Sequence, residues 1–167
     1  MANDTHTQFL KLNADEIHID GKTIDPNKIA WPSDWVGDIY KMHVHYKFHE
    51  PVENLDNANF KKLLGFRAAF IQEEVDELNE AIESNDAEEI VDALIDICVV
   101  AIGTLDLCKI DSHKAWQEVY KANMNKRVGI NPSRPNPLGL PDLIKPSGWE
   151  SPTHINNHGI LTDKLKD

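Results

Sequence analysis

The chain has 167 residues, of which 41% are hydrophobic and 27% charged, a balance typical of one compact domain with an ordinary apolar core. Its 28 acidic residues outnumber its 17 basic residues, which gives a formal net charge of −11. Such a charge repels a nucleic-acid backbone, so we expect no nucleic-acid partner.

The sequence favours neither export nor membrane insertion. The N-terminus lacks a basic region followed by an apolar one, and no run approaches the ~20 apolar residues that span a membrane. Cys98 and Cys108 lie in a strongly apolar stretch, where a free cysteine usually behaves as a small buried hydrophobe. We therefore expect a cytoplasmic protein without a membrane partner.

Residues 1–34 are expected to form an N-terminal arm that contains a small β-hairpin. The segment from Ile17 to Ile24 places Asp20-Gly21 between two short arms with alternating apolar residues. Asp-Gly in this setting is the strongest short-range signal for a two-residue hairpin turn. Pro26 and Pro32 then interrupt the chain before the first helix.

Residues 35–127 are expected to form an all-α core. Ser33 or Asp34 can cap a first helix that runs from Trp35 to about Phe48, before Pro51. A second, long helix is predicted from about Asn57 to Ser84, because apolar residues recur there at alternating three- and four-residue steps. The stripe consists of Leu64, Ala68, Ile71, Val75, Leu78 and Ile82.

Two more helices complete the predicted core. Asp86 and Glu89 form a start like a capping box for a third helix, over roughly residues 87–108, that is apolar nearly all round. A helix of this kind is normally buried centrally, so we expect a homodimer or homotetramer that covers its exposed side. Asp111-Ser112 then caps a fourth helix that runs to about Lys126.

Residues 128–167 are expected to form an extended tail. Prolines interleaved with glycines exclude regular helix over most of this stretch. The tail also carries apolar anchors, so we expect it to pack on the body or on a partner subunit. These anchors are Leu138, Leu140, Leu143, Ile144 and Trp149.

Two sets of carboxylates lie on the second and third predicted helices. The first set is Glu73, Glu74 and Glu77, and the second is Glu89, Asp92 and Asp96. Within each set the spacing places the side chains in one sector of the helix. Like charges at these spacings destabilise a bare helix by ~0.2–0.5 kcal/mol per pair. A source of positive charge should therefore compensate for them.

Divalent cations are the most economical compensation. Asp92 and Asp96 interrupt an apolar helix, yet no lysine or arginine occurs between Glu73 and Val100. Oxygen-only ligands select hard ions, which favours Mg²⁺ or Mn²⁺, with Ca²⁺ as the alternative. A di-iron carboxylate site would need Glu-x-x-His on a helix, and no histidine here has a glutamate three positions before it.

These residues also carry a family resemblance. Glu73-Glu74-Val75-Asp76-Glu77 followed by Glu89-Ile90-Val91-Asp92 resembles the EExxE…ExxD signature of the MazG and phosphoribosyl-ATP pyrophosphohydrolase-like superfamily. Gly103-Thr104-Leu105 and the segment from Glu118 to Lys126 are similar to that superfamily as well. The resemblance covers about residues 43–126, half of the chain, and implies a MazG-like bundle of four to five helices.

The resemblance implies hydrolysis of a nucleoside or deoxynucleoside triphosphate between its α and β phosphorus atoms. It implies that metal ions bind Glu73, Glu74, Glu77, Glu89 and Asp92. Glu73 or Glu74 would orient or deprotonate the attacking water. Asp96 is either an acceptor that fixes a metal ligand or a basic residue, or a satisfied polar residue near a subunit junction.

Other side chains are candidates for substrate binding. A cation-rich helix end would help the metal site to hold a triphosphate, and aromatic and histidine side chains on the first helix would line a pocket for the base. The candidates are Asn123, Lys126, Arg127, Arg67 and His43, with His45, Phe48 and His49 beside it. Two alternatives stay open: phosphoribosyl-ATP hydrolysis on the same fold, and a non-catalytic helical module whose acidic face binds a basic partner.

Overall fold

A computed structural model describes residues 17–19, 22–24, 34–133, 136–140 and 142–166, and divides the chain into two units, residues 1–34 and 35–167. In the first unit, β1 (Ile17–Ile19) pairs antiparallel with β2 (Lys22–Ile24), so that Ile17 lies opposite Ile24. The expected turn at Asp20-Gly21 and the candidate cap Ser33 lie outside the described residues.

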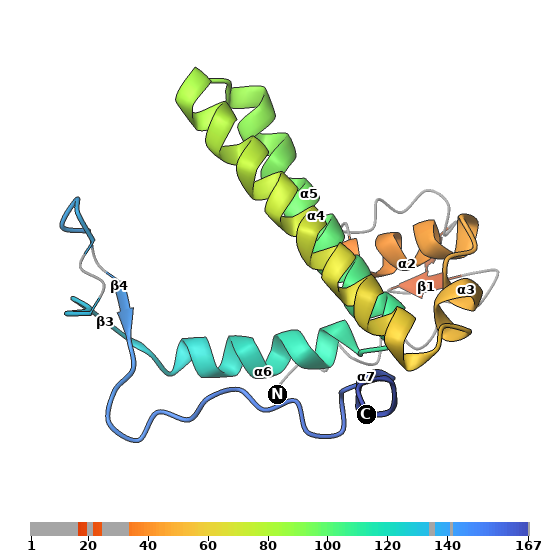
Figure 1. The fold of residues 1–167 in the computed structure, drawn as a ribbon. Coiled ribbons are helices and arrows are strands. Elements are labelled where there is room, and N and C mark those ends of the chain that lie inside the picture. The colour runs from red at the N-terminus through yellow and green to blue at the C-terminus, as the bar shows by residue number, and fades with distance from the viewer. Residues whose placement is uncertain (1–16, 20–21, 25–33, 134–135, 141, 167) are drawn as a thin grey trace. The chain divides into compact units, whose positions relative to one another are not determined.

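The second unit is mostly helical, which agrees with the predicted all-α class (Figure 1). Its helices are α2 (Trp35–His45), α3 (His49–Glu53), α4 (Asn57–Ser84), α5 (Ala87–Leu107), α6 (Ser112–Met124) and α7 (Leu161–Lys164). The first helix ends three residues earlier than expected, and Pro51 lies inside α3 rather than beyond a helix. Proline fits there because it stands in the first turn, where its missing N–H has no helical partner.

The helices α4 and α5 form a long hairpin in which α5 packs back along α4 (Figure 1). Asn85 ends α4 in a left-handed conformation, with φ 58°, and donates its N–H to the carbonyls of Ala81 and Ile82. The side chain of Asp86 then accepts the N–H groups of Glu88 and Glu89 and caps α5. The chain therefore reverses within two residues, and α4 and α5 must run antiparallel.

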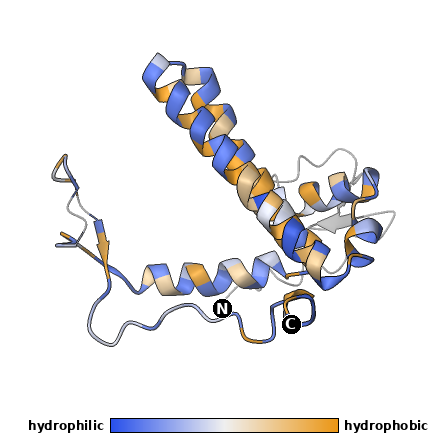
Figure 2. Cartoon of the chain, viewed as in Figure 1, coloured by the Kyte–Doolittle hydropathy of each residue, from blue (hydrophilic) through white to orange (hydrophobic). Residues whose placement is uncertain are grey.

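Within the single chain, α5 is not buried all round as the sequence suggests. Val91, Leu94 and Ile95 are 62%, 48% and 42% exposed, whereas Ala93 and Val100 are buried. The C-terminal part of α5 also packs on α2, but a pair of helices buries only one stripe of each member. Figure 2 accordingly shows hydrophobic and hydrophilic residues mixed along the outside of the hairpin.

The main hydrophobic core joins the N-terminal end of α4, the C-terminal end of α5 and the helix α3. Phe60 is completely buried at its centre, and burial of such a side chain stabilises the fold by about 1.5–3 kcal/mol. Val52, Leu107 and Cys108 complete the buried cluster, against which Ile160 and Leu161 from the C-terminal segment pack.

The C-terminal segment is fixed to the helices by hydrogen bonds. Trp149 donates its Nε1–H to the carbonyl of Ala122 at 2.7 Å, and the N–H of Ile160 bonds to the carbonyl of Cys108 at 2.9 Å. Between α6 and these contacts, β3 (Arg127–Gly129) pairs antiparallel with β4 (Asp142–Ile144). Among the described helices, none has the length and apolar character needed to cross a membrane.

Candidate active site

The carboxylates of α4 and α5 face one another along the hairpin. Burial raises the pKa of the Glu74 carboxyl, and the negative charges of Glu77, Asp96, Glu73 and Asp92 raise it further. Two of these four acids lie on α5, so the two predicted sets share one electrostatic environment. Asp96 is part of this group in space as well as in sequence.

Glu77 and Glu89 lie further towards the tip of the hairpin, where both line an open cavity of about 490 Å³. Glu80 lines the same cavity and was not among the candidates from the sequence. The sequence could have indicated Glu80, because it follows Glu77 by three residues and therefore lies on the same face of α4. The acidic surface thus extends from Asp96 to this cavity.

The donor set fits a hard divalent cation, because its atoms are carboxylate oxygens. The pKa of Glu74 is raised first by burial and then by four neighbouring negative charges, which a cation would offset. The acids do not form a tight cage: Glu73, Glu77, Glu89 and Asp92 are exposed. In the described part of the chain, the group of possible ligand atoms that lie within 4.8 Å of one another is His43, His49 and Asp106.

A largely apolar cavity of about 330 Å³ lies one helical turn from the carboxylates. Phe70 lines it from α4, four residues before Glu74, and Val99 lines it from α5, three residues after Asp96. At 1.5 Å per residue, these steps are about 6 and 4.5 Å along the helices. The remaining lining residues are Ile39, Met42, His43, Tyr46, Phe48, Arg67 and Val100.

His43 and Arg67 form the polar part of this cavity. Nδ1 of the buried His43 lies 2.6 Å from Oδ2 of Asp106. Arg67 donates from Nε to Oγ1 of Thr104 and from Nη2 to the carbonyl of Val100, both at 2.9 Å. Burial lowers the pKa of Arg67 from its usual value. A Cβ at Gly103 would lie 3.1–3.2 Å from both side chains, so glycine leaves them room.

The candidates at the end of α6 are not brought to the carboxylates in the single chain. Asn123 is exposed, Nζ of Lys126 lies 5.8 Å from the ring centroid of Trp149, and Arg127 lies opposite Ile144 in the β3–β4 pair. In Figure 1, α6 leads away from the α4–α5 hairpin. Their role in substrate binding remains a prediction.

Comparison with known proteins identifies the helical part of the chain. Residues 42–123 match the family model described as phosphoribosyl-ATP pyrophosphohydrolase. This segment belongs to the MazG-like all-α pyrophosphohydrolases. A search of curated proteins found no match for the chain.

The pyrophosphohydrolase segment contains the whole α4–α5 hairpin and therefore all five predicted metal ligands. It also includes the lining of the apolar cavity apart from Ile39. Lys126 and Arg127 lie beyond its end. The family consists of pyrophosphohydrolases, which act on acid anhydrides and in general depend on divalent metal, and the carboxylate-rich hairpin agrees with that class.

Proposed function

We propose that this pyrophosphohydrolase cleaves nucleoside or deoxynucleoside triphosphates with Mg²⁺, and that Mn²⁺ can replace Mg²⁺. The observation that carries the proposal is the position of the aromatic-lined cavity, one turn from the carboxylates on the same two helices. A nucleotide has the matching arrangement, with a flat apolar base at one end and a charged phosphate chain at the other. Apolar pockets with few polar groups commonly hold such ligands.

In this proposal, Glu73, Glu74 and Glu77 on α4 and Glu89 and Asp92 on α5 hold the ions. Bound Mg²⁺ supplies positive charge that neutralises the phosphate oxygens and activates water. Asp96, beside Glu74, would accept a hydrogen bond from a water or a basic residue at the site. The base enters the cavity, where the rings of Phe70, Tyr46 and Phe48 offer apolar faces.

Glu74 is the residue that we propose to accept the proton of the attacking water, because it lies among carboxylates of both α4 and α5. The water oxygen attacks the α phosphorus, the bond to the bridging oxygen breaks, and pyrophosphate leaves with that electron pair. The products are a nucleoside monophosphate and pyrophosphate. Glu73 shares the site and can orient the same water.

Phosphoribosyl-ATP is the second candidate substrate, because the matched family model carries that description. It also presents a purine base and a triphosphate chain, so the same cavity and carboxylates would serve it. A pyrophosphate-release assay across ribo- and deoxyribonucleoside triphosphates and phosphoribosyl-ATP separates the two candidates. Release from none of them in the presence of Mg²⁺ would overturn both and leave the non-catalytic acidic module.

We also propose that a second copy of the chain covers the exposed face of α5, in a homodimer or homotetramer. Val91, Leu94 and Ile95 offer an apolar surface on the same helix as the metal ligands. Sedimentation of the wild-type protein and of Leu94→Arg tests this: the wild type should be oligomeric and the variant monomeric. A monomeric wild type would overturn it.

A further inference from the structure

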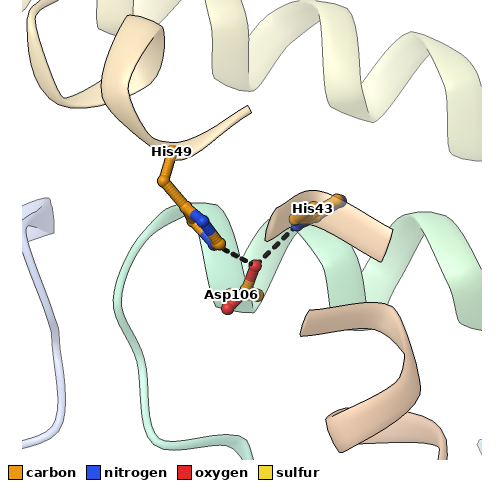
Figure 3. Close-up of side chains that lie close together, drawn as sticks. All are labelled: His43, His49 and Asp106. Carbon is orange, nitrogen blue, oxygen red and sulfur yellow. Dashed lines mark hydrogen bonds and ion pairs between the residues drawn. The ribbon is translucent and has the colours of Figure 1, made fainter. Parts of the chain in front are cut away.

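A second group of ligand atoms lies outside the acidic hairpin, where α2, α3 and α5 meet (Figure 3). Nδ1 of His43 and Nε2 of His49 lie 2.6 and 2.8 Å from the same oxygen, Oδ2 of Asp106. The three side chains come from three helices that span more than 60 residues of sequence. Their polar atoms nevertheless converge on one point.

We propose that His43, His49 and Asp106 form a binding site for a borderline divalent ion such as Zn²⁺, which fastens α2 and α3 onto α5. Two imidazole nitrogens and one carboxylate oxygen are the donors that Zn²⁺ accepts, whereas Mg²⁺ prefers oxygen ligands alone. This site is therefore chemically distinct from the carboxylates of the hairpin. The proposal of this site holds whichever substrate the enzyme cleaves.

The three ligand atoms lie within 4.8 Å of one another, and the two distances to Asp106 are close to those of a metal site. Tetrahedral bonds of 2.0–2.1 Å place neighbouring ligand atoms about 3.3 Å apart. The observed separations of 2.6 and 2.8 Å from Asp106 would widen by only about half an ångström, which is within the reach of small side-chain rotations. An ion would replace the two hydrogen bonds that now join the rings to the carboxylate.

Local backbone structure places the two histidines side by side. Lys47 adopts a left-handed conformation, with φ 57°, and the N–H of Phe48 bonds to the carbonyl of His43. The chain therefore turns back at the end of α2, and the rings of His43 and His49 meet edge to face at 5.8 Å. This turn preorganises two ligands before Asp106 approaches from α5.

Access and charge also agree with a metal site. The side chains of His43 and Asp106 are only 8% and 15% exposed, while His49 is 24% exposed and offers a path from solvent. With three protein ligands, the fourth position is left for water. In the described part of the chain, the ion pairs found for Asp106 are with these two histidines. A histidine carries a positive charge only when it is protonated, so a bound cation would supply the positive charge that neutral histidines do not.

The competing explanation is a hydrogen-bonded cluster that needs no ion. To separate the two, the acidic site is first removed by substituting all five proposed ligands, with Glu73→Gln, Glu74→Gln, Glu77→Gln, Glu89→Gln and Asp92→Asn. Zn²⁺ or Co²⁺ is then titrated into this chelator-treated protein at neutral pH. We expect one equivalent of Zn²⁺ per chain by calorimetry. With Co²⁺ we expect the visible absorption bands of a four-coordinate site with nitrogen ligands.

The matched variants are His49→Gln and His45→Gln in that same background. His49 is partly exposed, so its replacement should preserve the helical content, while His45 is exposed on α2 and outside the cluster. His49→Gln should weaken Zn²⁺ binding by at least ~100-fold, and His45→Gln should leave it unchanged. Absence of a stoichiometric site, or equal binding in both variants, would overturn the proposal. X-ray absorption of the Zn²⁺-loaded wild type should show imidazole ligands, and this test needs no substitution in the protein.

Discussion

The amide of Asn157 forms two hydrogen bonds with the backbone of Asp111, each 2.9 Å long. Oδ1 of Asn157 accepts the N–H of Asp111, and its Nδ2 donates to the carbonyl of the same residue. Asn157 is buried, so these bonds are shielded from water. They fix the C-terminal segment to the short connection between α5 and α6.

The first prediction concerns Gly159, two residues further along the segment. Its φ is +53°, and an added Cβ would lie 1.9 Å from the carbonyl oxygen of Cys108. Gly159→Ala should therefore break the neighbouring hydrogen bond from Ile160 to Cys108 and detach the segment. We expect a lower melting temperature and rapid proteolysis beyond α6.

Gly148→Ala is the matched control, because Gly148 also has a positive φ, +77°, but has no heavy atom within 4 Å of an added Cβ. The free energy of unfolding of this variant should fall by only the ~1–2 kcal/mol that the left-handed conformation costs an alanine. Equal destabilisation by the two variants would show that the close approach to Cys108 is unimportant.

The second prediction concerns Glu74. Glu74→Gln should lower kcat by at least ~100-fold, because a general base contributes that much or more. The fold should persist, and the metal-free variant should melt at a higher temperature than the wild type, since one of several repelling charges is gone. Mg²⁺ should raise the melting temperature of the variant less than that of the wild type.

Glu83→Gln is the control for that substitution, since Glu83 is an exposed residue of α4 beyond the carboxylates that influence Glu74. Turnover and the stabilisation by Mg²⁺ should stay at the wild-type level. If Glu74→Gln and Glu83→Gln behave alike in the pyrophosphate-release assay, Glu74 has no catalytic role.

The third prediction is the pH dependence of stability in the metal-free protein. The folded-state pKa of Glu74 is raised above its unfolded value, so this group favours folding below the unfolded pKa of about 4.3. That contribution is lost as pH rises through the folded-state pKa. Urea unfolding of the wild type should therefore show a decline in the free energy of unfolding over this window, and Glu74→Gln should show a smaller one. Parallel profiles for the two proteins would contradict this.

The fourth prediction tests the apolar cavity. Phe70→Ala should raise KM by about 3- to 10-fold, because a base loses one aromatic contact, while kcat changes less. The ring of Phe66 lies tilted against that of Phe70, with 4.3 Å between ring centroids. Phe66 is 56% exposed and does not line the cavity. Phe66→Ala should leave KM nearly unchanged, and a larger effect from Phe66 than from Phe70 would place the base elsewhere.

The bounds of α4 and α5 could be predicted because local signals determine them. The apolar stripe from Leu64 to Ile82 has helical periodicity, and Asp86 is a residue that caps helices well. The facing of the two carboxylate sets followed from the same periodicity once a short turn forced the helices to pack together. The local sequence of residues 73–96 was therefore enough to predict the helix bounds and the face on which each carboxylate lies.

The cluster of His43, His49 and Asp106 could not be predicted in this way. Asp106 is separated from the two histidines by 63 and 57 residues, so no local periodicity connects them. The aromatic cavity was predicted in part: His43 and Phe48, which line it, were candidates for a base pocket. Tyr46 and Phe70 were not, because Tyr46 follows α2 and Phe70 lies on α4, and no local pattern connects the two. The exposure of Val91 could not be predicted either, because it depends on which helices pack against α5. The periodicity of the sequence indicates only that a face of the helix is apolar.

The hairpin has one more consequence, for the order in which the protein folds. All of the carboxylates that surround Glu74 lie within 24 consecutive residues and meet across a turn that includes Asn85. Contacts that are close in sequence form quickly, whereas the contact of Ile160 with Cys108 must close a loop of about fifty residues. We therefore expect the α4–α5 hairpin to assemble before the C-terminal segment docks, so that an ion bound to the hairpin would already be present while the chain is still folding.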